Sequence, residues 1–173
     1  MDFSESEESV RVLGKIELKL LGGVFGEIQT DEIIITDERI KHILERHKED
    51  CDLFLKSVVS IVTQPDVVIK DYKNVGTVFM VKRMSNMNVN VVVRVALSTD
   101  KKELKNSVMT FYRLRDKNLK KLMKKNEVLY INEWIVHINH RIIRQWSKNY
   151  WSRDCAATHP LGQKKCGKGH THQ

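Results

Sequence analysis

Hydrophobic and polar positions alternate near the start of the chain, and then change to a helical repeat. Over 15–20, isoleucine and leucine alternate with charged residues, and a second apolar-rich stretch occupies 27–36. Both stretches predict strands, because successive side chains of a strand point to opposite faces. The segment 21–26 contains three glycines, and it is predicted to form the turn between the strands.

Two amphipathic helices are predicted next. Thr36 precedes two acidic residues, as a hydroxyl N-cap does when acids follow it near the positive end of a helix dipole. Apolar residues at helical spacing then predict one helix over 37–48 and another over 50–63. Pro65 ends the second helix, because proline disfavours a helical residue before it.

A run of strands follows the helices, and it decides the predicted fold class. Four stretches rich in β-branched residues are separated by polar turns: 67–70, 77–82, 88–97 and 106–113. The remaining predicted elements are a basic helix over 117–125, a small strand over 128–131 and a helix over 132–150. Helices followed by consecutive antiparallel strands favour an α+β fold.

Positive charge is concentrated in two segments. The chain has 173 residues with a formal net charge of +8, yet 113–125 and 141–173 each carry seven bases against one acid. Each segment is therefore +6, and the rest of the chain sums to −4. Such patches favour a polyanionic partner, and neither adjoins the strongly apolar face of a membrane-binding helix. The alternative is a solvated helix face plus a basic tail.

Several protein classes are disfavoured by what the sequence lacks. No apolar run approaches the roughly 20 residues of a membrane-spanning helix, and the acidic start does not resemble a secretory signal. The phosphate loop of NTPases and the motifs of zinc proteases and α/β-hydrolases are also missing. Three cysteines are too few for a disulfide framework and are typical of a reducing, cytoplasmic environment.

The C-terminal tail contains residues that could ligate zinc. Two cysteines and two histidines could supply a tetrahedral site: Cys155, His159, Cys166 and His170. Their spacing matches no common zinc finger. A flexible tail is therefore the preferred interpretation.

The first predicted helix carries candidate acid–base chemistry. His42 and Arg46 are helical neighbours on its polar side, whereas His47 falls on its apolar stripe. A half-buried histidine beside cationic groups could act as a general acid or base. The alternative is a core histidine with one hydrogen bond and a surface His/Arg pair.

Two later strands add candidate phosphate-binding residues. Arg94 interrupts a run of valines, where it is costly to bury unless it meets an anion or a carboxylate. A phosphate clamp and a buried ion pair both remain open. In 106–113, strict alternation groups Ser107 with Arg113 and puts Thr110 on the other face, so Thr110 and Arg94 could face one cleft.

Six segments together carry a family resemblance: ITDERIKHILERH (35–47), QPDVVIKD (64–71), GTVFMVKRM (76–84), NVVVRVAL (90–97), NSVMTFYRLRDKNLKKLMKK (106–125) and NEVLYINE (126–133). As an ordered set they resemble the phage-associated branch of the barnase–EndoU–colicin–RelE-like (BECR) nuclease superfamily. The resemblance implies N-terminal helices packed on a twisted antiparallel four-stranded sheet, with the active site on the exposed sheet face. The helix predicted over 132–150 adds a C-terminal helical extension to this fold.

The expected domain organisation has four parts, of which the second is a BECR-like domain. These parts are a disordered acidic start over 1–14, the nuclease domain over 15–131, a basic amphipathic helix over 132–150 and a flexible basic Cys/His tail over 151–173.

The resemblance also implies a metal-independent endoribonuclease of the toxin or mobile-element type, without a cofactor. Its motifs carry the catalytic role to His47, Arg94, Thr110, Arg113, His42, Ser107 and Arg46. The 2′-OH would attack the phosphate to leave a 2′,3′-cyclic phosphate, which needs a base, an acid and donors to the phosphorane.

RNA is the expected partner, and a cognate inhibitor protein is left open. The residues expected to follow the RNA backbone are Lys117, Lys120, Lys121, Lys124, Arg141 and Arg144. A membrane and zinc are not expected partners. The alternative function is a catalytically silent nucleic-acid- or protein-binding module on the same scaffold.

Overall fold

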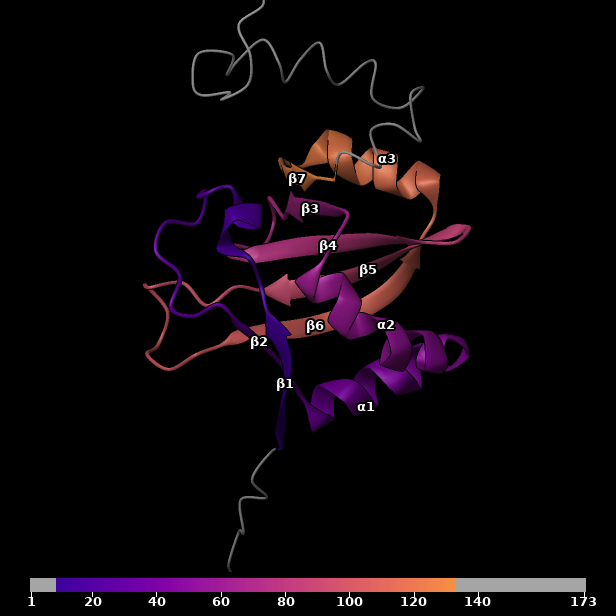
Figure 1. The fold of residues 1–173 in the computed structure, drawn as a ribbon, viewed down its shortest axis with the longest axis horizontal. Coiled ribbons are helices and arrows are strands. Elements are labelled where there is room, and N and C mark those ends of the chain that lie inside the picture. Colours follow the sequence, from indigo (N-terminus) through magenta and orange to yellow (C-terminus); the bar gives the residue numbers. More distant parts are fainter. Residues whose placement is uncertain (1–8, 133–173) are drawn as a thin grey trace, which may run out of the picture. The chain divides into compact units, whose positions relative to one another are not determined.

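A seven-stranded sheet organises residues 9–132, which are the part of the chain that the computed structural model describes (Figure 1). Its strands are β1 (Val10–Lys15), β2 (Glu32–Thr36), β3 (Val67–Lys70), β4 (Thr77–Met84), β5 (Met87–Arg94), β6 (Asn106–Leu114) and β7 (Val128–Ile131). They lie in the order β1-β2-β6-β5-β4-β3-β7. The helices are α1 (Asp37–Arg46), α2 (Cys51–Thr63) and α3 (Asp116–Lys125), with short 3₁₀ turns η1 (Leu18–Leu21) and η2 (Lys48–Asp50).

The predicted α+β class is confirmed, whereas the four-stranded antiparallel sheet is wrong. The hairpin of β1 and β2 extends the sheet because β2 pairs with β6, and β7 extends it at the other side by pairing with β3. The β2–β6 pair is parallel and the other pairs are antiparallel. The C-terminal extension predicted over 132–150 lies almost wholly outside the described residues, as does the tail.

The N-terminal strand lies earlier than the alternation predicts. β1 begins at Val10, inside the range expected to be disordered, and pairs along its length with β2. The predicted strand over 15–20 instead leads into η1, where Leu20 is buried and Leu18 is 45% exposed. Burial therefore does not follow the alternation there, and pairing with β2 fixes the strand.

Helices α1 and α2 cover one face of the sheet. The predicted N-cap is confirmed, since the Thr36 Oγ1 atom accepts a hydrogen bond from the Arg39 N–H at 3.2 Å. Phe54 of α2 packs edge-to-face on Phe111 of β6, with 5.1 Å between ring centroids. The helix face, as this side is called below, also presents the buried side chains of Val89, Val91 and Val93.

The opposite face of the central strands is called the distal face. On β5 it carries Asn88, Asn90, Val92 and Arg94, which alternate with the valines of the helix face. The first turn of α3 is attached to it, because the Asn88 Nδ2 donates to the Asp116 Oδ1 at 2.7 Å. Among the described residues, no helix is long and apolar enough to cross a membrane.

Candidate functional site

A β-bulge in β6 rearranges the side chains of the predicted site. In the β5–β6 register Val92 is opposite Thr110, but Val93 is opposite Val108, so Met109 is the extra residue. The extra residue inverts the alternation, and Ser107 therefore lies on the same face as Thr110. The prediction that Ser107 shares a face with Arg113 is wrong for this reason.

Three of the predicted residues lie together on the distal face. Arg94 is opposite Ser107, Val92 is opposite Thr110, and Asn90 is opposite Tyr112. Arg94, Ser107, Thr110 and Tyr112 are all half-buried. Arg94 and Thr110 thus lie on one face, and Tyr112 is a neighbour that the sequence analysis did not single out.

The Arg94 guanidinium is already engaged by a carboxylate. Its Nη2 lies 2.9 Å from each carboxylate oxygen of Asp100, and its Nη1 donates to the Val95 carbonyl. The group also covers Gly76, where an added Cβ would lie 2.0 Å from the Nη1. Of the two alternatives left open by the sequence, the structure contains the ion pair.

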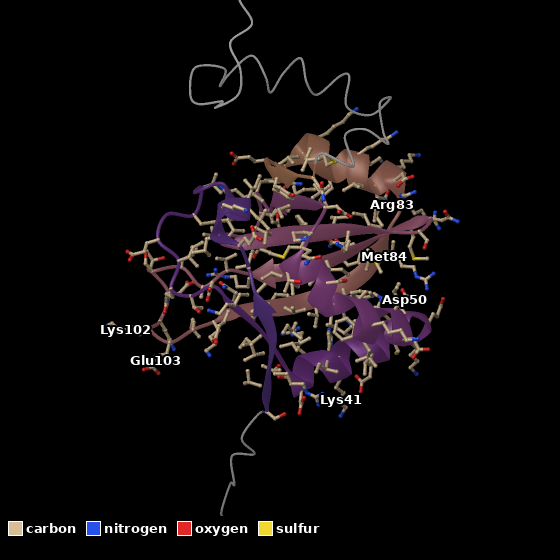
Figure 2. All side chains as sticks on the ribbon, in the orientation of Figure 1. Lys41, Asp50, Arg83, Met84, Lys102 and Glu103 are labelled. Carbon is tan, nitrogen blue, oxygen red and sulfur yellow. The ribbon has the colours of Figure 1, made fainter. Side chains whose placement is uncertain are left out.

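Arg113 lies on the helix face, near the histidine end of α1. It is opposite Val89, and its Nη2 binds the Asp50 Oδ1 at 2.5 Å. The Asp50 side chain is 13% exposed. The backbone N–H of Asp50 donates to the His47 carbonyl at 2.8 Å. Residues 47–51, called the His47 turn below, are linked to β6 by this ion pair, whose carboxylate residue, Asp50, is labelled in Figure 2.

Asp50 is the carboxylate near His47 that the sequence analysis missed. The predicted second helix begins at Asp50, which lies three residues after His47. That proximity in sequence was the available signal. Its pairing with Arg113 depends on the fold, because β6 lies far along the chain.

The predicted catalytic residues therefore form two groups on different faces of the sheet. Arg113 and the His47 turn meet on the helix face, whereas Arg94, Ser107 and Thr110 lie on the distal face. Within the described part of the chain, no hydrogen bond or ion pair joins His47 to Arg94 or Thr110. On α1, which contacts β6, His42 is half-buried and Arg46 is exposed.

Asn90 is an unusual residue in the middle of the distal face. It is 0% exposed, and neither its Nδ2 nor its Oδ1 has a hydrogen-bond partner among the described residues. Burial raises the pKa of Tyr112, Asn90 lowers that pKa through a side-chain interaction, and the Asp71 carboxylate raises it further.

A charged network fixes the start of α3 beside this group. The Arg83 Nη1 donates to the Asn88 Oδ1 at 3.1 Å and also binds Asp116. The hydrogen bond from Asn88, reinforced by Arg83, lowers the pKa of Asp116. The predicted RNA-binding lysines of α3 are all exposed: Lys117, Lys120, Lys121 and Lys124. Arg141 and Arg144 lie outside the described residues.

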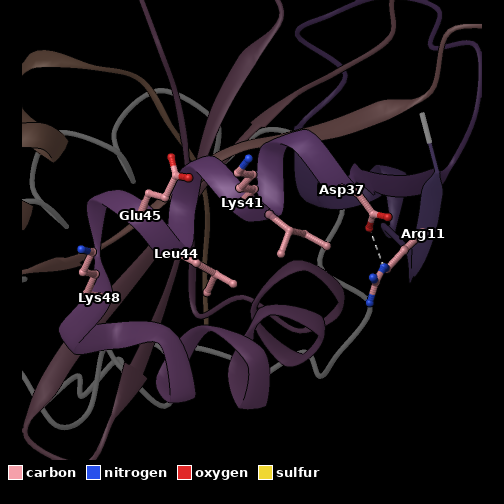
Figure 3. Close-up of a pocket in the computed structure, with 7 residues that line it drawn as sticks. Arg11, Asp37, Lys41, Leu44, Glu45 and Lys48 are labelled. Carbon is pink, nitrogen blue, oxygen red and sulfur yellow. Dashed lines mark hydrogen bonds and ion pairs between the residues drawn. The ribbon is translucent and has the colours of Figure 1, made fainter. Parts of the chain in front are cut away.

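A separate shallow pocket of about 380 Å³ lies between β1 and α1 (Figure 3). Its lining mixes both signs of charge around two apolar side chains: Arg11, Asp37, Ile40, Lys41, Leu44, Glu45 and Lys48. Within it, the Arg11 Nε donates to the Asp37 Oδ1 at 2.9 Å. None of the predicted catalytic residues lines this pocket, so it does not serve as their binding cavity.

Metal binding has no support in the folded part that is described. Residues 9–132 contain no group of three or more side chains placed to hold a metal ion. The candidate zinc ligands of the tail all lie outside these residues: Cys155, His159, Cys166 and His170.

The family described as "phage-Barnase-EndoU-ColicinE5/D-RelE like nuclease3" matches residues 14–121. The chain belongs to this nuclease family. The match covers more than half of the 173 residues and includes both groups of candidate residues. The resemblance found in the sequence is thereby confirmed. A search of curated proteins and a search of solved structures each found no match.

Proposed function

We propose that the chain is a metal-independent endoribonuclease whose active surface is the distal face of β5 and β6. The observation that carries this proposal is the common face of Arg94, Thr110 and Tyr112, which Ser107 joins because of the bulge at Met109. All of these residues lie within the range matched by the nuclease family. A toxin or mobile-element effector is the proposed type.

Metal-free RNA cleavage needs groups of the kinds found on this face. The hydroxyls of Ser107 and Thr110 are suited to donate to the non-bridging oxygens of the phosphorane. The phenol of Tyr112, whose pKa burial raises, is a further hydrogen-bond donor on this face. The proposed products are a 2′,3′-cyclic phosphate and a free 5′-hydroxyl.

His47 is the proposed acid or base only of an alternative site on the helix face, because the turn that follows α1 lies across the sheet from Thr110. The Asp50–Arg113 pair fixes the backbone of the turn in which it lies. A positioned acid or base of this kind contributes about 10²- to 10⁴-fold to a rate. His42, Arg46 and Arg113 are proposed to supply positive charge to that alternative site on the helix face.

A second candidate function is a catalytically silent binding module for nucleic acid. The observation that favours it is the Arg94–Asp100 pair, which occupies the arginine fork proposed as the phosphate clamp. If a bound phosphate replaced Asp100 as the partner of Arg94, the guanidinium would still be paired with an anion. The Arg94–Asp100 pair is therefore compatible with both functions. The two candidates differ in whether RNA is cut.

The deciding experiment is cleavage of a mixed RNA pool in EDTA, with analysis of the product ends. Wild type is expected to leave cyclic phosphates, and Thr110→Val to slow cleavage by roughly 10²-fold or more, as for loss of one oxyanion donor. Thr63→Val is the matched control, because Thr63 lies on α2 and bonds the Val59 carbonyl. Its cleavage should equal that of wild type.

Other outcomes separate the alternatives. Salt-sensitive RNA binding without cleavage would favour the binding module. Wild-type rates in Thr110→Val would place the site elsewhere. His47→Ala tests the acid–base role separately: normal cleavage by this variant, with loss in Thr110→Val, would retain the distal face and remove His47 from the mechanism.

A further inference from the structure

The turn between β3 and β4, residues 71–76, is held in one conformation by its own hydrogen bonds. The Asp71 carboxylate accepts hydrogen bonds from the Lys73 N–H at 2.9 Å and from the Asn74 Nδ2 at 2.7 Å. The Asp71 N–H donates to the Thr77 carbonyl at 2.8 Å, which closes the turn. A side chain carried by this turn is therefore presented to a ligand with little loss of backbone freedom on binding.

The same turn is attached both to the distal face and to the basic end of α3. On one side, the Gly76 carbonyl accepts the Val95 N–H at 2.7 Å, and the Arg94 guanidinium covers the α-carbon of Gly76. On the other side, the Tyr72 N–H donates to the side chain of Asn126, the C-cap of α3, at 3.1 Å. The turn therefore lies between Arg94 and the C-terminal end of α3.

Tyr72 is the aromatic residue that this turn exposes. It is 61% exposed, whereas every other phenylalanine and tyrosine within residues 9–132 is buried or half-buried. The Lys73 Nζ lies 5.9 Å from the centroid of the Tyr72 ring, within the range of a cation–π contact. Lys124 and Lys125, in the last turn of α3, are exposed as well.

These three lysines are available to a ligand, because none of them has an acidic partner within the described part of the chain. An exposed ring beside unpaired cations is the combination that binds single-stranded nucleic acid. The ring stacks on a base, and the cations attract the backbone.

The sheet register places Tyr72 close to the proposed phosphate site. Ser107, Arg94 and Thr77 are direct cross-strand partners on β6, β5 and β4, and Thr77 is hydrogen-bonded to Asp71, the residue before Tyr72. Neighbouring strands are separated by about 4.8 Å, so three spacings put the backbone of Asp71 about 14 Å from that of Ser107. A short oligonucleotide can therefore reach both places, because a stacked strand rises about 3.4 Å per nucleotide.

A protein partner is the other class of ligand for an exposed tyrosine. Val75, in the same turn, is 81% exposed, so the turn also offers apolar surface. Lysine, however, is depleted at the centres of protein–protein interfaces. The three lysines around Tyr72 therefore favour a polyanion as the ligand of this turn.

We propose that Tyr72 forms a stacking site for an unpaired nucleobase, next to the phosphate-binding residues of the distal face. The base lies on the exposed ring, and Lys73, Lys124 and Lys125 attract the phosphates on either side of it. A base inside a duplex cannot use this site, because its two faces are stacked on neighbouring base pairs. This inference rests on the proposed ribonuclease function and adds that the RNA is unpaired near the bond that is cut.

The test measures the binding of two fluorescently labelled 2′-O-methyl RNA probes in EDTA, one without base pairing and one a blunt duplex. These probes lack the free 2′-OH that the proposed reaction needs, so they stay intact. Tyr72→Ala should raise the Kd of the unpaired probe by roughly 5- to 150-fold, as expected for the loss of one stacked base. The Kd of the duplex should not change.

Val75→Ala is the matched control, because it shortens a more exposed side chain of the same turn. It should bind both probes as wild type does. Tyr72→Phe should also keep its affinity for the unpaired probe, since the aromatic ring remains. Because Tyr72 and Val75 are exposed, all three variants should unfold at the temperature of wild type.

Probes with one abasic position test whether the ring contacts a base. At one position, removing the base should weaken binding to wild type as much as Tyr72→Ala does, and it should have no further effect on Tyr72→Ala. Tyr72→Leu, which keeps the bulk without the flat ring, provides the same cycle if the alanine variant does not fold. Equal losses for the unpaired and duplex probes, an equal loss in Val75→Ala, or fully additive losses in this cycle would overturn the proposal.

Failure of the two proposals can be told apart. If wild type cuts RNA and Tyr72→Ala binds both probes normally, the ribonuclease stands and the stacking site fails. If wild type cuts no RNA but the probes show the expected pattern, the ribonuclease fails and the stacking site stands as part of a binding module. If wild type binds neither probe, the stacking site fails whatever the cleavage assay shows.

Discussion

At the scale of single residues, the guanidinium of Arg94 is the best-anchored cation of the sheet. Asp100 meets it through both oxygens and also accepts the Leu97 N–H at 2.8 Å. Gln29 donates to the Leu97 and Lys101 carbonyls of the same loop. The pair therefore ties the end of β5 to the following connection.

Asp100→Asn is predicted to lower the free energy of unfolding by about 1–2 kcal/mol, because a half-buried arginine loses its charged partner. The Arg94 and Asp100 side chains are 33% and 22% exposed, so water screens part of the interaction. Urea unfolding measures the change. Glu32→Gln, which breaks a more exposed pair with Lys105, should change stability far less. Equal losses in the two variants would contradict this explanation.

The sequence predicts the environment of a residue correctly where the chemistry of that side chain alone determines which partner it needs. The cost of burying Arg94 correctly required an anionic partner, although Asp100 itself lies in a polar connection with no distinguishing pattern. The position of Ser107 was not predictable, because the bulge at Met109 leaves the alternation of residue types unchanged. The sequence does not distinguish Asn90 from other polar positions, because its lack of hydrogen-bond partners is visible only in the folded structure.

At the scale of elements, the sequence predicts the helices more accurately than the strands, because the signals for a helix are local. The cap at Thr36 and the apolar spacing of α2 act within one or two turns, so α1 begins at the predicted residue and α2 begins one residue later than predicted. Strand β1 depends on pairing with β2 across a turn, which alternation alone does not specify. The same dependence on distant partners explains why β2 was expected to join other strands only in antiparallel pairs.

The attachment of α3 to the sheet is predicted to weaken in acid. The lowered pKa of Asp116 means that its stabilising contribution is present above the unfolded value of 3.8 and is lost as the pH falls through the lower folded value. Urea unfolding followed from pH 7 down to about pH 3 should show a shallower acid loss in Asp116→Asn than in wild type. Parallel curves for the two proteins would show that Asp116 contributes nothing to this dependence.

At the scale of the whole molecule, the proposed RNA path runs along one positively charged element. The lysines of α3 are exposed, and α3 begins beside the distal face through the Asp116 network. RNA bound across β5 and β6 would therefore meet these lysines as it leaves the site. Each phosphate that a lysine neutralises releases counterions, so binding should fall steeply with salt.

Neutralising three lysines of α3 is predicted to weaken RNA binding and flatten its salt dependence. Changing Lys117, Lys120 and Lys121 to glutamine should reduce the slope of log K against log salt by about 0.7 for each lost phosphate contact. The matched control changes Lys41, Lys48 and Lys56, which are exposed on α1, η2 and α2, and it lowers the net charge equally.

The comparison separates a specific surface from a general charge effect. Net charge acts at long range and is screened within about 10 Å at 0.1 M salt, so both triple variants should lose the same steering of RNA. Direct contacts to phosphate would be lost in the α3 variant alone. Binding titrations across several salt concentrations should therefore give parallel lines for wild type and the control, and a shallower line for the α3 variant. Three parallel lines would show that the RNA path does not run along α3.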